Sequence, residues 1–227
     1  MQFDLTYLLL AIPRLLQYMY LTISIAVISM ILGLILGLIL EHVIRKKIKV
    51  LAWAAKVYIS FFRATPLLVQ LFILYYGIPQ IIPIFSEMNA FTATIIGISL
   101  NSAAYMAEII RAAVRSVDHG QWEAGLSIGM TRWQSMKRII LPQAFRIALP
   151  SLGNTFVTIL KETSLGFTLG LTEMLAKAKL LAADTYKFLE CFLAAAILYW
   201  VTAILFGYIQ MRLERKANEP YGNEVGL

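Results

Sequence analysis

The stretch Tyr18–Leu40 contains no charged residue and is long enough to cross a bilayer, since one helical crossing takes about 20 apolar residues. The rest of the chain follows the same pattern, because 59% of its 227 residues are hydrophobic and only 15% are charged. This composition leaves too few polar side chains to cover a water-soluble surface. Inside lipid, backbone groups must find their hydrogen bonds within the protein. We therefore expect an all-α, polytopic membrane protein.

The apolar runs predict five transmembrane helices. The second run contains Lys56, Arg63 and Pro66, which favours a kinked span, although its first half could instead lie along the cytoplasmic interface. The fourth run is interrupted by KETS at 161–164. The predicted spans cover about 18–40, 51–78, 91–113, 147–171 and 188–211.

The distribution of cations predicts the orientation of these spans. Most Lys and Arg residues fall within 41–50, 111–146 and 212–227, as in cytoplasmic flanks. This pattern places the N-terminus outside and the C-terminus inside, with 1–227 as one transmembrane domain and 114–146 as a cytoplasmic loop. Pro79–Ala90 then forms an outer loop. The other outer loop, Thr172–Lys187, carries three lysines, and we interpret it as a short surface helix.

Several functional classes find no support in the sequence. The net charge of +7 comes from cation clusters beside apolar runs, which indicates membrane orientation and no nucleic-acid partner. The phosphate-binding pattern GxxxxGK[ST] is absent, so any ATP-driven work requires a partner. His42 and His119 lie in separate predicted loops without metal-ligand spacing, and Cys191 is expected to be a small packing residue. We predict no catalytic and no metal-binding residues.

Polar residues inside the predicted spans are candidates for a solute pathway, because charges in hydrocarbon usually face a cavity or each other. Lys161 and Glu162 are such residues, unless the fourth span ends at Leu160 and both charges lie among headgroups. Asn101 and Glu108 share one helix face at a spacing of seven residues. Glu108 could instead pair with an arginine near the cytoplasmic end, Arg111 or Arg115.

Two further patterns concern helix contacts. Gly33 and Gly37 form GxxxG, which permits close helix approach but is also common in membrane spans. Between Asp118 and Pro142 the sequence predicts two short helices. Asp118 would cap the first in a capping box with Gln121, Gly129 would form the turn, and Thr131 would cap the second.

The segment 123–142 resembles the EAA motif of ABC-importer permeases. The motif has the form E-A-A, three residues, G, nine residues, I-x-L-P, and Gly125 replaces its second alanine. FFRATPLLVQLF (61–72) resembles the RGTPLLVQ segment of polar amino-acid permeases, with Ala64 in place of glycine. LGNTFVTILKETSL (152–165) resembles LGN...LKDTSL of that family, with Glu162 in place of Asp. The matching motif positions are Glu123, Ala124, Gly129, Ile139, Leu141 and Pro142.

This resemblance implies a type I ABC importer permease fold in the bacterial plasma membrane. It implies that polar amino acids cross by alternating access. The implied partners are two cytoplasmic ATPase subunits that use ATP and Mg, a second permease subunit of the same or a related chain, an extracytoplasmic solute-binding protein and membrane lipid. The chain itself is then no enzyme and holds no cofactor. The alternative is an ion-coupled carrier or channel that uses Glu108 or Glu162.

Candidate site residues follow from the motifs and the resemblance together. For ATPase coupling they are Gln121, Trp122, Glu123, Ala124, Gly125, Ser127, Gly129, Leu141 and Pro142. For the substrate pathway they are Arg63, Thr65, Pro66, Asn101, Glu108, Asn154, Lys161, Glu162, Thr163 and Ser164.

Overall fold

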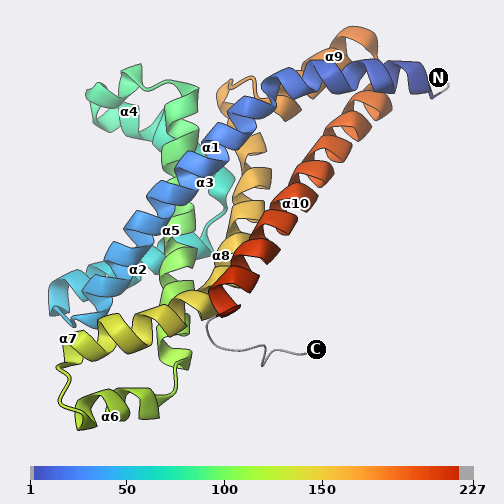
Figure 1. The fold of residues 1–227 in the computed structure, drawn as a ribbon. Coiled ribbons are helices and arrows are strands. Elements are labelled where there is room, and N and C mark those ends of the chain that lie inside the picture. Colours follow the sequence, from blue (N-terminus) through green and yellow to red (C-terminus); the bar gives the residue numbers. More distant parts are fainter. Residues whose placement is uncertain (1–2, 220–227) are drawn as a thin grey trace.

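The computed structural model describes residues 3–219, and within that range the chain is helical with short connections, which confirms the predicted all-α fold (Figure 1). Residues 1–2 and 220–227 of the predicted domain lie outside the described residues. Two of the elements are π-helices, η1 and η3, and two are 3₁₀-helices, η2 and η4. In chain order the elements are α1 (Leu5–Arg45), α2 (Lys49–Ala64), α3 (Leu67–Phe72), η1 (Ile73–Gly77), α4 (Ile78–Ile81), η2 (Pro83–Glu87), α5 (Ala90–Ser116), α6 (His119–Ser127), α7 (Arg132–Ser135), η3 (Met136–Ile140), α8 (Leu141–Glu162), η4 (Thr163–Leu169), α9 (Met174–Thr185) and α10 (Phe188–Asn218).

The first helix is longer than predicted. It begins at Leu5 and not at Tyr18, and the Asp4 carboxylate accepts a hydrogen bond from the Tyr7 backbone N–H at 3.0 Å. Its first turns are stabilised by packing, because Ala11 and Leu15 are buried in a cluster shared with α9 and α10. Figure 1 shows this part of α1 lying beside α9, while its lower half runs along α5.

The predicted kink in the second span is a sharp break. α2 and the segment Leu67–Ile81 meet at an angle of 112° across Thr65 and Pro66. Proline has no N–H to donate and disfavours helical geometry at the residue before it, which explains why Thr65 is extended. The chain therefore changes direction at Pro66.

The GxxxG pattern forms a close helix contact. A Cβ atom on Gly37 would lie 3.0 Å from Met106 Cβ and 3.1 Å from the Ala103 carbonyl oxygen, and one on Gly33 would clash with Ser102 Oγ. α1 and α5 thus pack backbone to backbone through small residues, as membrane helices often do. This contact holds α5 in the centre of the molecule (Figure 1).

The fourth predicted span, 147–171, has different boundaries in the structure. α8 begins earlier, at Leu141, and ends at Glu162, and the chain continues as the 3₁₀-helix η4. Within the described range, three helices are long and apolar enough to cross a membrane, or four if the broken pair around Pro66 counts as one. α8 is not among them, and it contains the charged residues Arg146, Lys161 and Glu162 as well as several amides and hydroxyls. The fifth span and the orientation of the termini remain predictions.

The two predicted outer loops contain short helices. α9 lies within 172–187, as expected of a short helix there, but one side of it is buried against α1 and α10. The loop 79–90 holds α4 and η2. At the other end of the molecule, α6 and α7 lie together below α5, on the side where α1 ends (Figure 1).

Candidate functional site

The break at Pro66 frees backbone carbonyl groups that other side chains satisfy. The Phe62 carbonyl would normally accept the N–H of residue 66, which proline lacks. Instead, it accepts hydrogen bonds from Asn101 Nδ2 at 3.0 Å and from Gln70 Nε2 at 3.1 Å. Gln70 Nε2 also lies 3.0 Å from the Thr65 carbonyl, and Asn101 Nδ2 donates to Gln70 Oε1 at 2.9 Å. These side chains fix the end of α2 against α5.

A pocket of about 420 Å³ opens beside this break, between α2, α5 and α8. It combines one guanidinium, two carboxylates, two amides and several hydroxyls in a largely apolar protein. Such a set of polar groups can bind a small polar solute and fix its orientation. The lining residues are Arg63, Asn101, Ser102, Tyr105, Glu108, Ile109, Asn154, Thr155, Thr158, Ile159 and Glu162.

Glu108 is the electrostatic centre of the pocket. Its Oε2 lies 3.7 Å from Arg63 Nη1 and also forms an ion pair with Arg111. Pairing with Arg111, one of the two alternatives for Glu108, is therefore confirmed, and the same side chain also lines the pocket. The Arg63 guanidinium additionally lies 5.7 Å from the centre of the Tyr105 ring. Arg63 thus bridges α2 and the polar face of α5.

The structure brings half of the predicted pathway residues together in the pocket: Arg63, Asn101, Glu108, Asn154 and Glu162. The others lie elsewhere. Lys161 is exposed and does not line the pocket, although the sequence placed it beside Glu162. The Thr163 and Ser164 hydroxyls donate to the carbonyls of Leu160 and Lys161, and they stabilise the change from α8 to η4. Thr65 and Pro66 form the break described above.

Sequence reasoning missed Gln70 and four polar residues of the pocket, Ser102, Tyr105, Thr155 and Thr158. The available signal was the spacing of polar residues along one face of each helix. Tyr105 lies four residues after Asn101, and Thr158 lies four after Asn154 and four before Glu162, so each set shares one face. Listing the polar residues on these faces of α5 and α8 would have predicted most of the pocket lining.

The groove between α5 and α8 continues towards α6. A second hollow of about 420 Å³ shares Glu108 and Ile109 with the first. It is also lined by Ser116, at the end of α5, and by Ser151 of α8. The polar pocket is therefore connected to the end of the molecule where α6 lies.

The predicted helix–turn–helix around Gly129 is only partly as expected. Asp118 caps α6 by accepting the Gly120 N–H at 2.7 Å, but Gln121 accepts a hydrogen bond from Gln143 Nε2 and does not complete a capping box with Asp118. Gly129 has a φ of +82°, as a left-handed turn requires. Thr131 caps α7 in a full capping box with Gln134.

The second predicted helix is not a separate short element. α7 continues through the π-helix η3 directly into α8. The Leu141 N–H donates to the Met136 carbonyl five residues back, so Pro142 follows a π-helical turn within one continuous helical segment. Leu141 and Pro142 are therefore outside α6. Leu141 lines a groove against α1 and is not part of the exposed surface of α6.

α6 presents an exposed surface and packs through its other side. Gln121, Glu123, Ala124, Ser127 and Gly129 are exposed, whereas Trp122 is half-buried. Gly125 is buried, and a Cβ there would lie 2.6 Å from Ser135 Oγ and 3.0 Å from Ile139 Cδ1. Gly125 at the second alanine position of the motif thus allows α6 to approach η3 closely. Two exposed apolar residues at the tip, Leu126 and Ile128, lie within the segment from Glu123 to Gly129 that is predicted to contact the ATPase.

Comparison with known proteins agrees with these features. Residues 29–219 match the family described as binding-protein-dependent transport system inner membrane component. The chain is 52% identical over 218 residues to the probable amino-acid permease protein YxeN of Bacillus subtilis, with 96% of this chain and 97% of that protein covered. It is 49% identical over 221 residues to the probable amino-acid ABC transporter permease protein PatM of Vibrio harveyi, with coverages of 97% and 99%.

Solved structures show the same fold. A crystal structure of an amino acid ABC transporter with histidines aligns with a TM-score of 0.88 and 33% identity, covering 95% of this chain and all of that one (100%). The MetNI methionine ABC transporter in an inward-facing conformation aligns with a TM-score of 0.72 at 18% identity, covering 96% of this chain and 99% of that one, and supports the fold alone. This chain therefore belongs to the family of inner membrane components of binding-protein-dependent transport systems, among its amino-acid ABC transporter permeases.

Proposed function

We propose that this chain is the permease subunit of an ATP-driven importer of polar amino acids in a bacterial plasma membrane. The observation that carries the proposal is the pocket between α2, α5 and α8, which is lined by Arg63 and by two carboxylates, Glu108 and Glu162. A free amino acid carries one carboxylate and one ammonium group. Arg63 is suited to the carboxylate, since a guanidinium binds carboxylates with two parallel hydrogen bonds. Glu162 and Glu108 are suited to the ammonium group.

The ion pairs of the pocket fit a solute that carries both charges. Glu108 pairs with Arg63 and Arg111, so cationic and anionic groups lie side by side beside the pocket. Relatives of this chain are named as cystine, arginine and glutamine permeases, which supports amino acids as the substrate class.

The proposed energy source is a pair of cytoplasmic ATPase subunits that bind ATP and Mg and contact α6. Two features support this role: α6 exposes Leu126 and Ile128 at its tip, and its other side is braced by close packing of Gly125 on Ser135. A rigid, exposed helix can transmit movement of a partner to α5 and α8. Closure of the ATPases would then alternate the α5–α8 groove between inward-open and outward-open states. A second permease subunit and an external solute-binding protein complete the proposed complex.

Uptake by reconstituted vesicles tests this function. The chain is co-purified with its ATPase and binding protein, and uptake of labelled amino acids is measured with and without ATP inside the vesicles. We expect ATP-dependent uptake, and Arg63→Gln or Glu162→Gln should lower the apparent affinity at least about tenfold through loss of a charge-assisted hydrogen bond.

Matched controls are available on the same molecule. Lys56→Gln removes a cation from the exposed side of α2, and Glu87→Gln removes a carboxylate from the loop 79–90; neither residue lines the pocket. Both variants should transport normally. Uptake driven by a pH gradient without ATP would support the ion-coupled alternative and contradict the proposal.

A further inference from the structure

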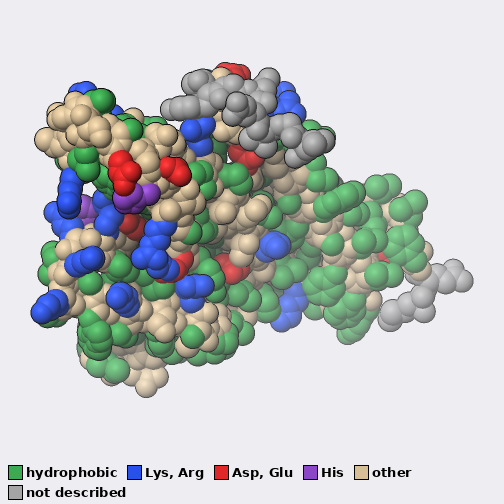
Figure 2. Space-filling view, turned by 90° about the horizontal axis from the view of Figure 1, so that it is seen from below, with side chains coloured by type: hydrophobic (Ala, Val, Ile, Leu, Met, Phe, Trp, Pro, Cys, Tyr) green, Lys and Arg blue, Asp and Glu red, His purple; other side chains and the backbone are tan. Residues whose placement is uncertain are grey.

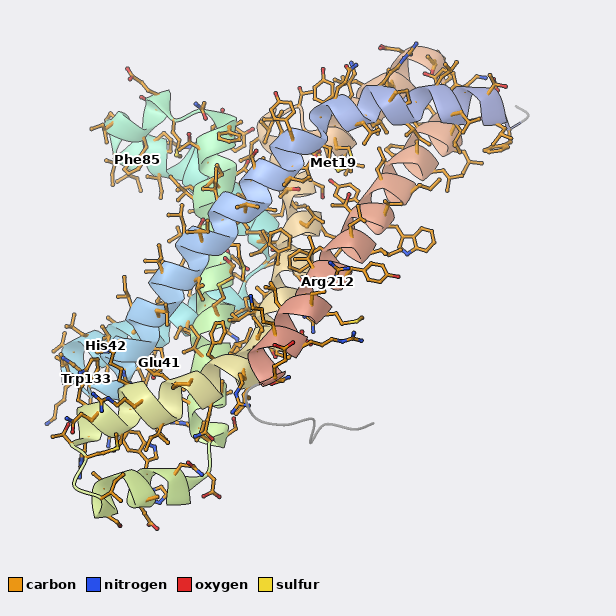
Figure 3. The ribbon with its side chains drawn as sticks, in the orientation of Figure 1. Met19, Glu41, His42, Phe85, Trp133 and Arg212 are labelled. Atoms are coloured by element: carbon orange, nitrogen blue, oxygen red, sulfur yellow. The ribbon has the colours of Figure 1, made fainter. Side chains whose placement is uncertain are left out.

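A second polar pocket lies at the end of the molecule where α1 terminates, separate from the pocket beside Pro66. Its volume is about 680 Å³. His42, Arg45 and Lys46 line it from the last turn of α1, and Trp122, Arg132 and Trp133 line it from α6 and α7. Figure 3 shows His42, Glu41 and Trp133 close together there, and Figure 2 shows Lys and Arg side chains gathered on this end of the molecule.

The charge of this pocket is positive. Three of its lining residues are cations and none is a carboxylate. Glu41 lies behind them and pairs with Arg45 at 3.3 Å, so it neutralises part of the charge. Two aromatic indole rings complete the wall. Clustered Lys and Arg beside membrane helices on the cytoplasmic side typically bind anionic headgroups.

A separate apolar groove lies along the same side of α1. Leu34 and Leu38 line this groove of about 190 Å³ together with Leu141 and Phe145 of α8. Residues four apart share a helix face, so Leu34 and Leu38 of the groove and His42 of the basic pocket form one row on α1. Phe145 is 58% exposed and Leu38 is 48% exposed, so the groove is open to the surroundings.

Exposed tryptophans lie at the same end of the molecule as the pocket. Trp53, near the start of α2, and Trp133 are 68% and 64% exposed, and both are near the end of the 41-residue helix α1. Tryptophan is enriched where a bilayer meets water. A basic pocket at this end with an apolar groove on the same side of α1 has the shape and charge of a phospholipid site.

We propose that the pocket of His42, Arg45, Lys46 and Arg132, together with this groove, binds an anionic phospholipid of the inner leaflet. The phosphate lies among the cations, and one acyl chain lies along Leu34, Leu38 and Phe145. The lipid bridges the end of α1 and the start of α7, next to α6. The groove distinguishes this ligand from a soluble phosphate or an acidic side chain of the ATPase, because neither would occupy an apolar channel.

Quenching of tryptophan fluorescence by brominated lipids measures this binding. In the double variant Trp53→Phe/Trp200→Phe, the remaining tryptophans, Trp122 and Trp133, both line the pocket. The full chain, assembled with its ATPase, is placed in vesicles containing brominated phosphatidylglycerol or brominated phosphatidylcholine. We expect stronger quenching by phosphatidylglycerol. Changing Arg45, Lys46 and Arg132 to Gln should lower this preference by about fivefold for each cation removed.

The control variant changes Lys49, Lys137 and Arg138 to Gln, which removes the same charge from exposed positions at the same end that do not line the pocket. Its preference should remain near that of the parent, and an equal loss in both triple variants would overturn the proposed site.

Displacement of the lipid by millimolar inorganic phosphate would indicate a soluble-phosphate site instead. Absence of quenching by either lipid in the assembled complex would show that a partner subunit covers the pocket, which also overturns the proposal. Assembly with the ATPase rests on the proposed function, but lipid binding is read out here without transport, so failure of lipid binding and failure of transport are distinguishable.

Discussion

The amide side chain of Gln70 compensates for a hydrogen bond that Pro66 cannot make. Its Nε2 lies 3.1 Å from the Phe62 carbonyl and 3.0 Å from that of Thr65, and the side chain is buried. In a water-poor interior, an unpaired carbonyl is costly. The sharp break between α2 and α3 therefore depends on a side chain one turn beyond the proline.

Replacing Gln70 tests this role. In Gln70→Leu the two carbonyls lose a donor, and we expect the free energy of unfolding to fall by about 1–3 kcal/mol. Thermal unfolding in detergent micelles measures the change. Gln80→Leu is the matched control, because the Gln80 amide bonds to the Tyr76 carbonyl at an exposed position. A similar loss of stability in both variants would refute the role assigned to Gln70.

Single residues also show the limit of reasoning from the sequence. Charges inside apolar runs are recognisable, and for this reason Arg63, Glu108 and Glu162 were found in advance. Lys161 and Glu162 were grouped because they are adjacent, but neighbours on a helix with 3.6 residues per turn point about 100° apart. Only Glu162 faces the pocket. Hydrogen-bond partners such as Gln70 and Asn101, far apart in the sequence, could not be inferred from local patterns.

At the scale of elements, helix ends were predictable where capping residues fix them. Thr131 and Gly129 have the roles expected from their residue types. The start of α1 was missed although Asp4 offers a local capping signal, because the first turns also depend on packing against α9 and α10. The junction of η3 and α8 was missed because the π-helix η3 places Pro142 inside a continuous helical segment, and the residue pattern does not reveal a π-helical turn.

The turn at Gly129 is the most direct test of the proposed coupling role of α6. A Cβ at this position would meet no atom within 4 Å, so the positive φ is the only constraint on the residue type. Valine in a left-handed conformation costs about 1–2 kcal/mol. We expect Gly129→Val to assemble normally in the membrane but to lose most solute-stimulated ATP hydrolysis by the complex.

The control for this variant is Gly129→Asn, because asparagine tolerates left-handed geometry far better than valine. It should retain most of the stimulated hydrolysis. If the two variants behaved alike, the conformation of the turn would not explain the result. Equal stimulation in Gly129→Val and the parent would disprove the proposed role of the turn.

At the scale of the whole molecule, the side chains of the described residues form three apolar clusters. The first joins the middle of α1 with α3, α5 and α8, and the second joins the first turns of α1 with α9 and α10. The third is smaller and joins the end of α1 with α2 and α5. The sequence predicted apolar runs but not this division, since it depends on which faces meet. The long helix α1 takes part in all three clusters (Figure 1).

A buried carboxylate, Glu173, connects the elements of the second cluster. It is fully buried at the start of α9 and accepts the backbone N–H groups of Leu175 and Ala176 at 2.9 and 2.8 Å. It also accepts the hydroxyls of Tyr199 on α10 at 3.1 Å and Thr22 on α1 at 3.4 Å. One side chain thus fixes α9 against both long helices.

This arrangement predicts that Glu173 contributes more to stability than any of its single partners. Glu173→Leu leaves four donors without their acceptor, whereas Tyr199→Phe and Thr22→Val each remove one donor, at a cost of about 1 kcal/mol. We expect the unfolding midpoint of Glu173→Leu in detergent to fall well below that of either partner variant. A midpoint equal to that of Tyr199→Phe would mean that packing of Met174 and Leu181, and not the carboxylate, holds α9 in place. α9 connects the α8 side of the chain to α10, so its position determines how α10 packs on α1. The same measurement therefore tests how α10 is held against α1.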